Sequence, residues 1–154
     1  MLESLLTASL GWQWLGLFVV SFLAATLLPL GSEVVLLAVV TQHPEAALGS
    51  WWWATLGNTL GGLTNWLLGR YFLAYKDRRW FPLSSTQLER VHVLFTRYGQ
   101  PILLLSWLPA IGDGLCLAAG VARLKLMNCA VWVMIGKGLR YAVVIWGTNA
   151  VWLS

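Results

Sequence analysis

Four charged side chains lie inside otherwise apolar stretches of the sequence. Two are carboxylates, Glu33 and Asp113, and two are bases, Lys137 and Arg140. Ionisable groups are rare in membrane segments, where they mark substrate or proton pathways. A carboxylate there can take a proton from one side of the membrane and release it to the other, while lysine and arginine can hold an anionic phosphate. We therefore take these four residues as the candidate substrate and proton pathway.

The two bases are three residues apart, so Lys137 and Arg140 lie on one face of a helix and can point together at a site. If both carboxylates converge with them, protonation of one acid leaves the site net positive and receptive to an anion. The alternative is two buried ion pairs, Glu33 with Arg140 and Asp113 with Lys137, that only fix the register of the fold. The sequence leaves both interpretations open.

Each carboxylate follows a break in an apolar run. The first break reads Leu-Pro-Leu-Gly-Ser-Glu over residues 28–33 and the second Leu-Pro-Ala-Ile-Gly-Asp over residues 108–113. Proline interrupts the helical ladder and glycine lets the backbone turn. In lipid, broken backbone persists only where protein or a water-filled cavity covers it. We expect two helical hairpins that enter the membrane and turn back, with tips at Pro29, Gly31, Pro109 and Gly112. The simpler alternative is a pair of surface loops with each acid in the headgroup region.

The composition is that of an integral membrane protein. Of the 154 residues, 58% are hydrophobic and only 10% are charged, which argues against a soluble domain. Eleven tryptophans fit aromatic belts at the two membrane interfaces. No Ser/His/Asp set, metal-ligand spacing or phosphate loop is evident, and no basic run suits nucleic acid. We therefore expect no enzyme, no catalytic residue, no cofactor, no metal and no nucleic-acid partner.

Long apolar segments must position these charges. Residues 11–28 and the short run Val34–Val40 form the first hairpin, and a helix from Trp51 to Arg70 follows. The stretch from Arg70 to Tyr98 is rich in Arg and Lys, so it is cytoplasmic and contains a short amphipathic helix. The last segment, Asn128–Leu153, is long enough to span the membrane.

Small residues recur along the helix that begins at Trp51. They leave one face with almost no side-chain volume, a pattern that lets another helix approach closely. The asparagines on this face can make interhelical hydrogen bonds; the alternative role is direct contact with substrate. The residues of this face are Gly57, Asn58, Gly61, Gly62, Asn65 and Gly69.

The charge distribution predicts an all-α integral membrane fold in an inverted-repeat arrangement. No Lys or Arg precedes Arg70, whereas Arg123 and Lys125 follow the second hairpin. We expect one membrane domain, 1–154, with a hairpin and helix over 11–70, a cytoplasmic connector over 71–100, and an opposed hairpin and helix over 101–153. Inverted repeats with broken helices near the midplane are a transporter architecture. The alternative topology counts residues 11–28 as a full span with the N-terminus inside.

Five sequence blocks together resemble the DedA superfamily (VTT domain), most closely its small YqaA-type members. The resemblance extends from Leu27 to Tyr141, about three quarters of the chain. The blocks are Leu-Pro-x-Gly-Ser-Glu-Val-Val-Leu over 28–36, Gly-Asn-x-x-Gly-Gly-Leu-Thr-Asn over 57–65, Ser-Trp-x-Pro-x-x-Gly-Asp over 106–113, Ala-Gly over 119–120 and Gly-Lys-x-x-Arg-Tyr over 136–141.

The resemblance implies a multi-pass bacterial inner-membrane protein with two re-entrant hairpins, of the fold shared with eukaryotic lipid scramblases. It also implies movement of undecaprenyl phosphate or other lipids that depends on proton motive force, so that membrane lipids, a lipid phosphate and protons are the expected partners. In the larger family the first hairpin carries an additional acid upstream of its proline, and the second hairpin carries arginines near its tip. In this chain residues 16–28 contain no acid, and Asp113 is the only charge between Gln100 and Val121, so Lys137 and Arg140 are the residues that would supply the positive charge.

Two functions follow as expectations. The first is a transporter or flippase for a lipid or other amphipathic anion, with proton coupling. The alternative is a non-transporting membrane protein that supports envelope integrity through helix–helix contacts with a partner or with a second copy of the chain.

Overall fold

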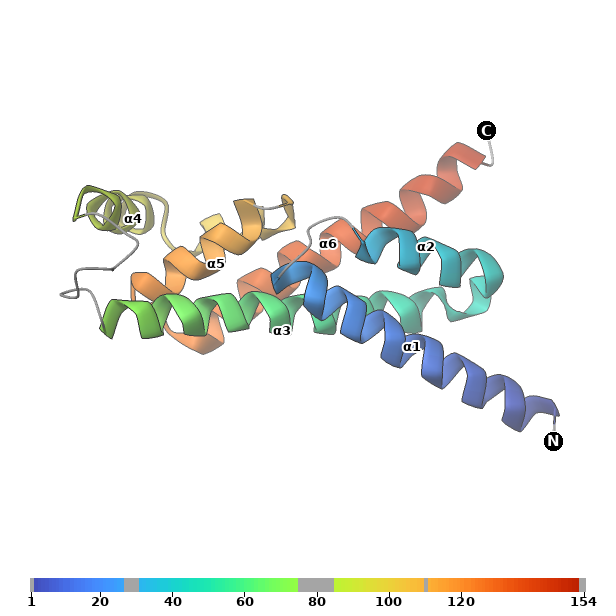
Figure 1. Cartoon of the computed structure of the whole chain (residues 1–154). Helices are drawn as coiled ribbons and strands as arrows, with labels where there is room; N and C mark the ends of the chain where they lie inside the picture. The colour runs from blue at the N-terminus through green and yellow to red at the C-terminus, as the bar shows by residue number, and fades with distance from the viewer. Residues whose placement is uncertain (1, 27–30, 75–84, 110, 153–154) are drawn as a thin grey trace. The chain divides into compact units, whose positions relative to one another are not determined.

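The computed structural model describes residues 2–26, 31–74, 85–109 and 111–152, and within these ranges every regular element is a helix. The prediction of an all-α fold is therefore confirmed for the described residues. In chain order the elements are α1 (Leu2–Thr26), α2 (Ser32–Gln42), the 3-10 helix η1 (Pro44–Ala46), α3 (Ala47–Ala74), α4 (Ser85–Tyr98), the 3-10 helix η2 (Gln100–Trp107), α5 (Ile111–Val121) and α6 (Leu126–Trp152) (Figure 1).

Two helices are longer than the sequence pattern predicted. Helix α1 begins at Leu2 rather than near residue 11, because the chain before residue 11 contains no proline or glycine to stop it. Helix α3 begins at Ala47, four residues before Trp51, directly after the single turn that Pro44 opens. Proline favours the start of a helix because its missing N–H would have no partner there.

The helices divide into two compact units. The first comprises residues 1–61 and 137–154, and the second comprises residues 62–136. Helices α3 and α6 each contribute one segment to each unit.

The core of the first unit combines residues from four helices. Its buried members are Leu17, Leu36, Val40, Ala54, Tyr141 and Ile145. Two tryptophan N–H groups are hydrogen-bonded at its edges: Trp14 donates to Ser50 Oγ over 3.2 Å, and Trp51 donates to the carbonyl of Gly138 over 2.8 Å. These bonds pair α1 with α3 and α3 with α6.

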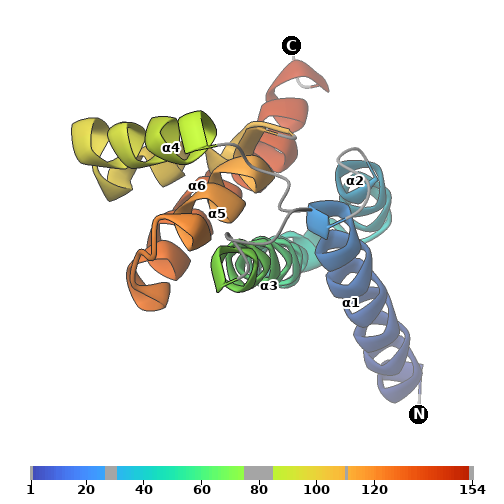
Figure 2. The ribbon, with the colours of Figure 1, turned by 60° about the vertical axis from the view of Figure 1, so that its left-hand side comes forward.

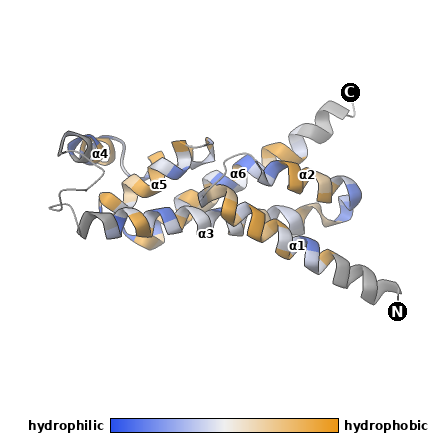
Figure 3. Cartoon of the chain, in the orientation of Figure 1, coloured by the Kyte–Doolittle hydropathy of each residue, from blue (hydrophilic) through white to orange (hydrophobic). Residues whose placement is uncertain are grey.

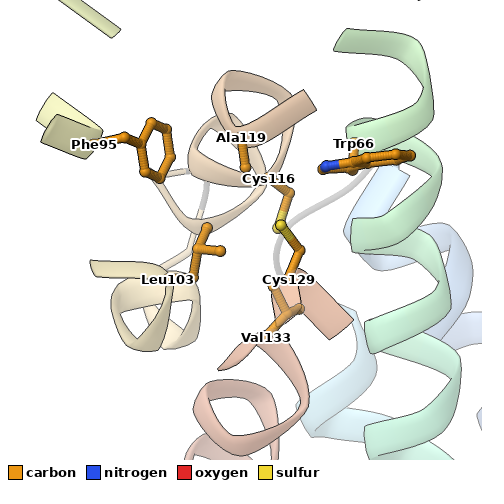
Figure 4. Packing of buried hydrophobic residues seen from close by; sticks show 7 residues of the cluster. All are labelled: Trp66, Phe95, Leu103, Cys116, Ala119, Cys129 and Val133. Atoms are coloured by element: carbon orange, nitrogen blue, oxygen red, sulfur yellow. The ribbon is translucent and has the colours of Figure 1, made fainter. Parts of the chain in front are cut away.

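The core of the second unit is drawn from α3, α4, η2, α5 and α6 (Figure 4). Figure 2 shows α5 alongside the N-terminal part of α6. The predicted amphipathic helix is present as α4, and its Phe95 is buried in this core with Val91 packed beside it. Glu89, Arg90 and Arg97 remain exposed on the other side of α4.

The second predicted hairpin differs from an ordinary pair of α-helices. Its first arm, η2, is a 3-10 helix of eight residues, a length that is uncommon for this geometry. It follows Gly99, whose φ of 66° favours glycine, and Pro101 is its second residue. The turn is closed by the N–H of Gly112, which donates to the carbonyl of Leu108 over 2.9 Å.

One helix among the described residues is long and apolar enough to cross a membrane, namely the segment Leu126–Gly147 of α6. Helix α3 has 28 residues, about 42 Å, but its asparagines and glycines lower its apolar character. Helices α2 and α5 have 11 residues each, about 16 Å, or roughly half of a 30 Å hydrocarbon core. Figure 3 shows apolar residues along α1, α2 and α5 and more mixed stretches along α3 and α6.

Candidate functional site

The central feature of the first unit is an ion pair between Glu33 on α2 and Arg140 on α6. The two side chains are 19% and 12% exposed, so most of the pair is withdrawn from the surface. Glu33 also lies in the first turn of α2, where the partial positive charge of the helix N-terminus favours a carboxylate. Of the four charges predicted to form the pathway, these two are brought together within one unit.

Lys137 precedes Arg140 by almost one turn of α6 and is 1% exposed. It is engaged in an interaction, as is Asp113. Buried ammonium groups are costly and are retained where they pair or bind. The site therefore contains two bases of α6 within one turn of each other.

Tyr141, the residue after Arg140, joins three helices through its hydroxyl group. The ring is fully buried. The side-chain amide of Asn58 on α3 donates to the hydroxyl oxygen over 2.7 Å, and the hydroxyl donates to Ser32 Oγ on α2 over 2.9 Å. Ser32 is 1% exposed and Asn58 2% exposed, so both bonds are closed off from the surface.

These hydrogen bonds continue to the ion pair. Ser32 Oγ donates to the Glu33 carboxylate at Oε2, over a long 3.5 Å. The N–H of Asn58 can only donate, so the Tyr141 oxygen is the acceptor in that bond. The Tyr141 hydroxyl in turn donates its hydrogen bond to Ser32, and the Ser32 hydroxyl donates to Glu33. The result is a directed chain of donors that ends on the carboxylate opposite Arg140.

Further buried polar atoms lie beside this chain. Ser21 Oγ on α1 is fully buried and interacts with the hydroxyl group of Tyr141. The Asn58 carbonyl oxygen Oδ1 is buried and has no hydrogen-bond partner among the described residues. Such atoms are rare in folded proteins and indicate a site for water or another hydrogen-bonding group.

Asp113 belongs to the second unit, where it lies in the first turn of α5 and is partly buried. Its convergence with Glu33, Lys137 and Arg140 stays a prediction. Of the expected hairpin tips, Gly31 immediately precedes α2, and Pro109 and Gly112 flank the start of α5. Pro29 lies outside the described residues.

The small-residue face of α3 is covered from within the chain. A Cβ atom added at Gly57 would collide with the carbonyl of Phe18 on α1, and one at Gly61 would lie 2.6 Å from the carbonyl of Phe22. In the second unit, a Cβ on Gly69 would collide with the carbonyl of Leu117 on α5. Gly62 faces Cys116 and Val133, while Asn65 has a partner of its own.

Sequence reasoning gave no role to Tyr141 or Ser32, although each adjoins a charge that it did select. The sequence feature that could have identified them is their position next to a charge inside an apolar segment. Ser32 directly precedes Glu33, and Tyr141 directly follows Arg140. The prediction that an asparagine of this face makes an interhelical hydrogen bond is confirmed for Asn58, whose amide donates from α3 to Tyr141 on α6. Among the described residues, no three His, Cys, Asp or Glu side chains are grouped to hold a metal ion.

Comparison with known proteins places these features in a family. The model of the VTT domain matches residues 28–148, a range that includes Glu33 and Arg140. The chain is 45% identical over 131 residues to "Inner membrane protein YqaA" of Escherichia coli (strain K12), covering 83% of this chain and 85% of that protein. It has the same identity and coverage with "Inner membrane protein YqaA" of Shigella flexneri.

A third relative, named "Uncharacterized protein", from Haemophilus influenzae, is 35% identical over 138 residues, which are 84% of this chain and 83% of the relative. None of these names describes an enzyme. No solved structure matches the chain.

Proposed function

We propose, from the premise that this chain belongs to the VTT-domain (DedA) family and lies in the cell inner membrane, that it moves a lipid or another amphipathic anion across the bilayer. The observation that carries the proposal is the Glu33–Arg140 pair beside Lys137 in α6, the helix with the length and composition of a membrane span. Charges in such a helix are costly and are typically functional.

The chemistry of this group suits exchange of one anion for another. Arginine and lysine both bind phosphate, arginine through two parallel N–H donors. A phosphate headgroup that binds Arg140 competes with the Glu33 carboxylate. When Glu33 is displaced, it takes up a proton, because a carboxylate with no counter-charge is unstable in an apolar medium. Anion and proton then move together, and the net charge of the site is conserved.

Two re-entrant hairpins in an inverted repeat are the architecture that we propose for this activity, with opposed halves over 11–70 and 101–153. The shortness of α2 and α5 supports it, since neither can cross the hydrocarbon core alone. The first hairpin is tested by replacing Cys116 and Cys129 and then introducing one cysteine, either at Gly11 or at Gln42. Each variant is labelled with a membrane-impermeant thiol reagent. Labelling from the same side supports a re-entrant hairpin, and labelling from opposite sides means that α1 or α2 crosses.

Lipid translocation in proteoliposomes tests the function. The cargo is undecaprenyl phosphate or a labelled anionic phospholipid, with an imposed pH gradient. We expect Glu33→Gln and Arg140→Gln to lower the gradient-driven rate by at least about tenfold, in the range that one buried charge-assisted contact supplies. Asp113→Asn, measured in the same way, tests whether the second carboxylate belongs to the pathway.

Glu45→Gln is the matched control, because Glu45 is a carboxylate of the same unit whose side chain is 69% exposed in the turn between α2 and α3. This control should translocate lipid at the wild-type rate. Folded wild-type protein that moves neither cargo, or a Glu33→Gln variant as active as the control, would contradict the proposal.

The alternative of a non-transporting interaction protein relied on the small-residue face of α3. That face is occupied by α1 at Gly57 and Gly61 and by α5 at Gly69. It therefore offers a partner protein little surface without rearrangement, and we favour transport.

A further inference from the structure

We propose that Ser32 and Tyr141 form a hydroxyl relay that delivers a proton to Glu33 from an internal water held by Ser21 and Asn58. This inference rests on the proposed function, which makes Glu33 a proton acceptor, and it names the route. Ser32 and Tyr141 are proton-relay residues and Asn58 is a positioning residue.

The direction of the hydrogen bonds supports the relay. Asn58 donates to Tyr141, Tyr141 to Ser32 and Ser32 to Glu33 Oε2. Two of these links are hydroxyl groups, which can accept one proton while they release another. The amide of Asn58 cannot do so at ordinary pH. Its role is to occupy one lone pair of Tyr141 and hold the hydroxyl group where it donates to Ser32.

The water at the far end of the relay is inferred from buried polar atoms beside Tyr141. Ser21 Oγ on α1 is buried and interacts with the tyrosine hydroxyl, and Asn58 Oδ1 on α3 is buried with no hydrogen-bond partner among the described residues. Two or more convergent polar groups are what an internal water requires. A water held there can donate to the remaining lone pair of Tyr141, which gives the relay its proton source.

One turn of the relay moves one proton. The O–H bond of Ser32 breaks as its proton joins Glu33 Oε2, and Ser32 Oγ receives the proton of Tyr141. Tyr141 receives a proton from the internal water, and the water is restored by a proton from bulk solution. The net change is one proton moved from solution to Glu33. Rotation of the two hydroxyl groups then resets the chain.

The surrounding charges are few. On the segments of the first unit that contribute to the site, the charged or titratable groups are Glu33 on α2 and Lys137, Arg140 and Tyr141 on α6. Neither α1 from Leu10 to Thr26 nor α3 from Ala47 to Gly61 carries any. Within this unit, Arg140 and Lys137 are therefore the charged groups that protonation of Glu33 affects.

Infrared spectroscopy after a rapid pH drop tests the relay without any transport. A protonated carboxyl group has its own C=O band. The band that appears in the wild type and is missing in Glu33→Gln is assigned to Glu33. The lipid mimic dodecyl phosphate is added to occupy Arg140. We expect Tyr141→Phe and Ser32→Ala to slow the rise of this band by at least about tenfold, since a positioned proton donor typically contributes on the order of a hundredfold. The final amplitude should remain that of the wild type, and Ser32→Thr should restore the rate.

Ser50→Ala is the matched control, because Ser50 is another fully buried serine of this unit whose hydroxyl is bonded to Trp14 rather than to the relay. It should leave the rate unchanged. An unchanged rate in folded Tyr141→Phe and Ser32→Ala, an equal slowing in Ser50→Ala, or the absence of any Glu33 band would overturn the relay. A normal Glu33 band in a protein that moves no lipid would reject the proposed function and leave the relay standing.

Discussion

Asn58 on α3 and Tyr141 on α6 are 83 residues apart in the sequence, yet the amide Nδ2 of Asn58 lies 2.7 Å from the hydroxyl oxygen of Tyr141. The bond is buried on both sides and links the first half of the chain to its last helix. Buried interhelical hydrogen bonds in membrane proteins contribute about 0.6 kcal/mol on average and up to about 1.7 kcal/mol.

This bond makes Asn58 and Tyr141 energetically coupled. We expect Asn58→Leu and Tyr141→Phe each to lower the free energy of unfolding, and the double variant to lose about 0.5–1.5 kcal/mol less than the sum. Denaturant unfolding in detergent, followed by helical circular dichroism, measures all four forms. Additive losses would mean that the bond contributes nothing to stability.

The ion pair should respond unequally to removal of its two partners. Glu33→Gln leaves the guanidinium of Arg140 charged at every accessible pH, whereas Arg140→Gln leaves a carboxylate that can be neutralised by a proton. We therefore expect Glu33→Gln to be the more destabilising of the two variants. Its free energy of unfolding should fall by about 3–5 kcal/mol, the loss typical of a buried pair from which one partner is removed. The free energies of unfolding of both variants at neutral pH check the order, and the reverse order would contradict it.

The approach of α1 to α3 depends on Gly57. A methyl group there meets the backbone of Phe18, which can yield only if the helices separate. We expect Gly57→Ala to cost about 1–3 kcal/mol. Gly16→Ala on α1 is the control, because no atom lies within 4 Å of its added Cβ, and it should be neutral or stabilising by up to about 1 kcal/mol. Melting temperatures in detergent compare the two; similar melting temperatures would exclude this close packing.

Two glycines of α5 offer the same contrast in the second unit. A Cβ at Gly120 would collide with the carbonyl of Trp66 on α3, whereas a Cβ at Gly114 has no neighbour within 4 Å. Gly120→Ala should destabilise the protein by about 1–3 kcal/mol and Gly114→Ala should not. Protease resistance of the purified variants is a suitable readout, and equal resistance would place α5 elsewhere.

The turn between α2 and α3 should become less stable in acid. A backbone hydrogen bond and the His43 side chain, 3.2 Å away, lower the pKa of Glu45 from its ordinary value of 4.5. A lowered carboxylate pKa stabilises the folded state above the ordinary value, and this stabilisation is lost as pH falls through the folded-state value. Because the Glu45 side chain is mostly exposed to solvent, the effect is small. Glu45→Gln should flatten the fall in melting temperature below about pH 4.5; an unchanged slope would count against the bond.

Much of the fold followed from local properties of the sequence. The apolar runs predicted helices, and the structure has α6 over Leu126–Trp152 where Asn128–Leu153 was expected. The amphipathic pattern after Ser85 predicted α4. The 3-10 geometry of η2 was not predicted. An apolar run after proline has the same sequence pattern whether its backbone hydrogen bonds join residues three apart, as in a 3-10 helix, or four apart, as in an α-helix.

The sequence by itself determined that the chain is a helical membrane protein, because hydrophobicity, helix propensity and charge are read residue by residue. It also selected Glu33 and Arg140, since a charge in an apolar segment is conspicuous wherever it lies. Only the tertiary structure decided that these two pair with each other, that Asn58 bonds to Tyr141, and that Ser32 connects the tyrosine to the carboxylate. The reason is physical: a hydrogen bond between helices depends on which faces meet and at what depth, and neither is encoded in the spacing of residues along a single helix.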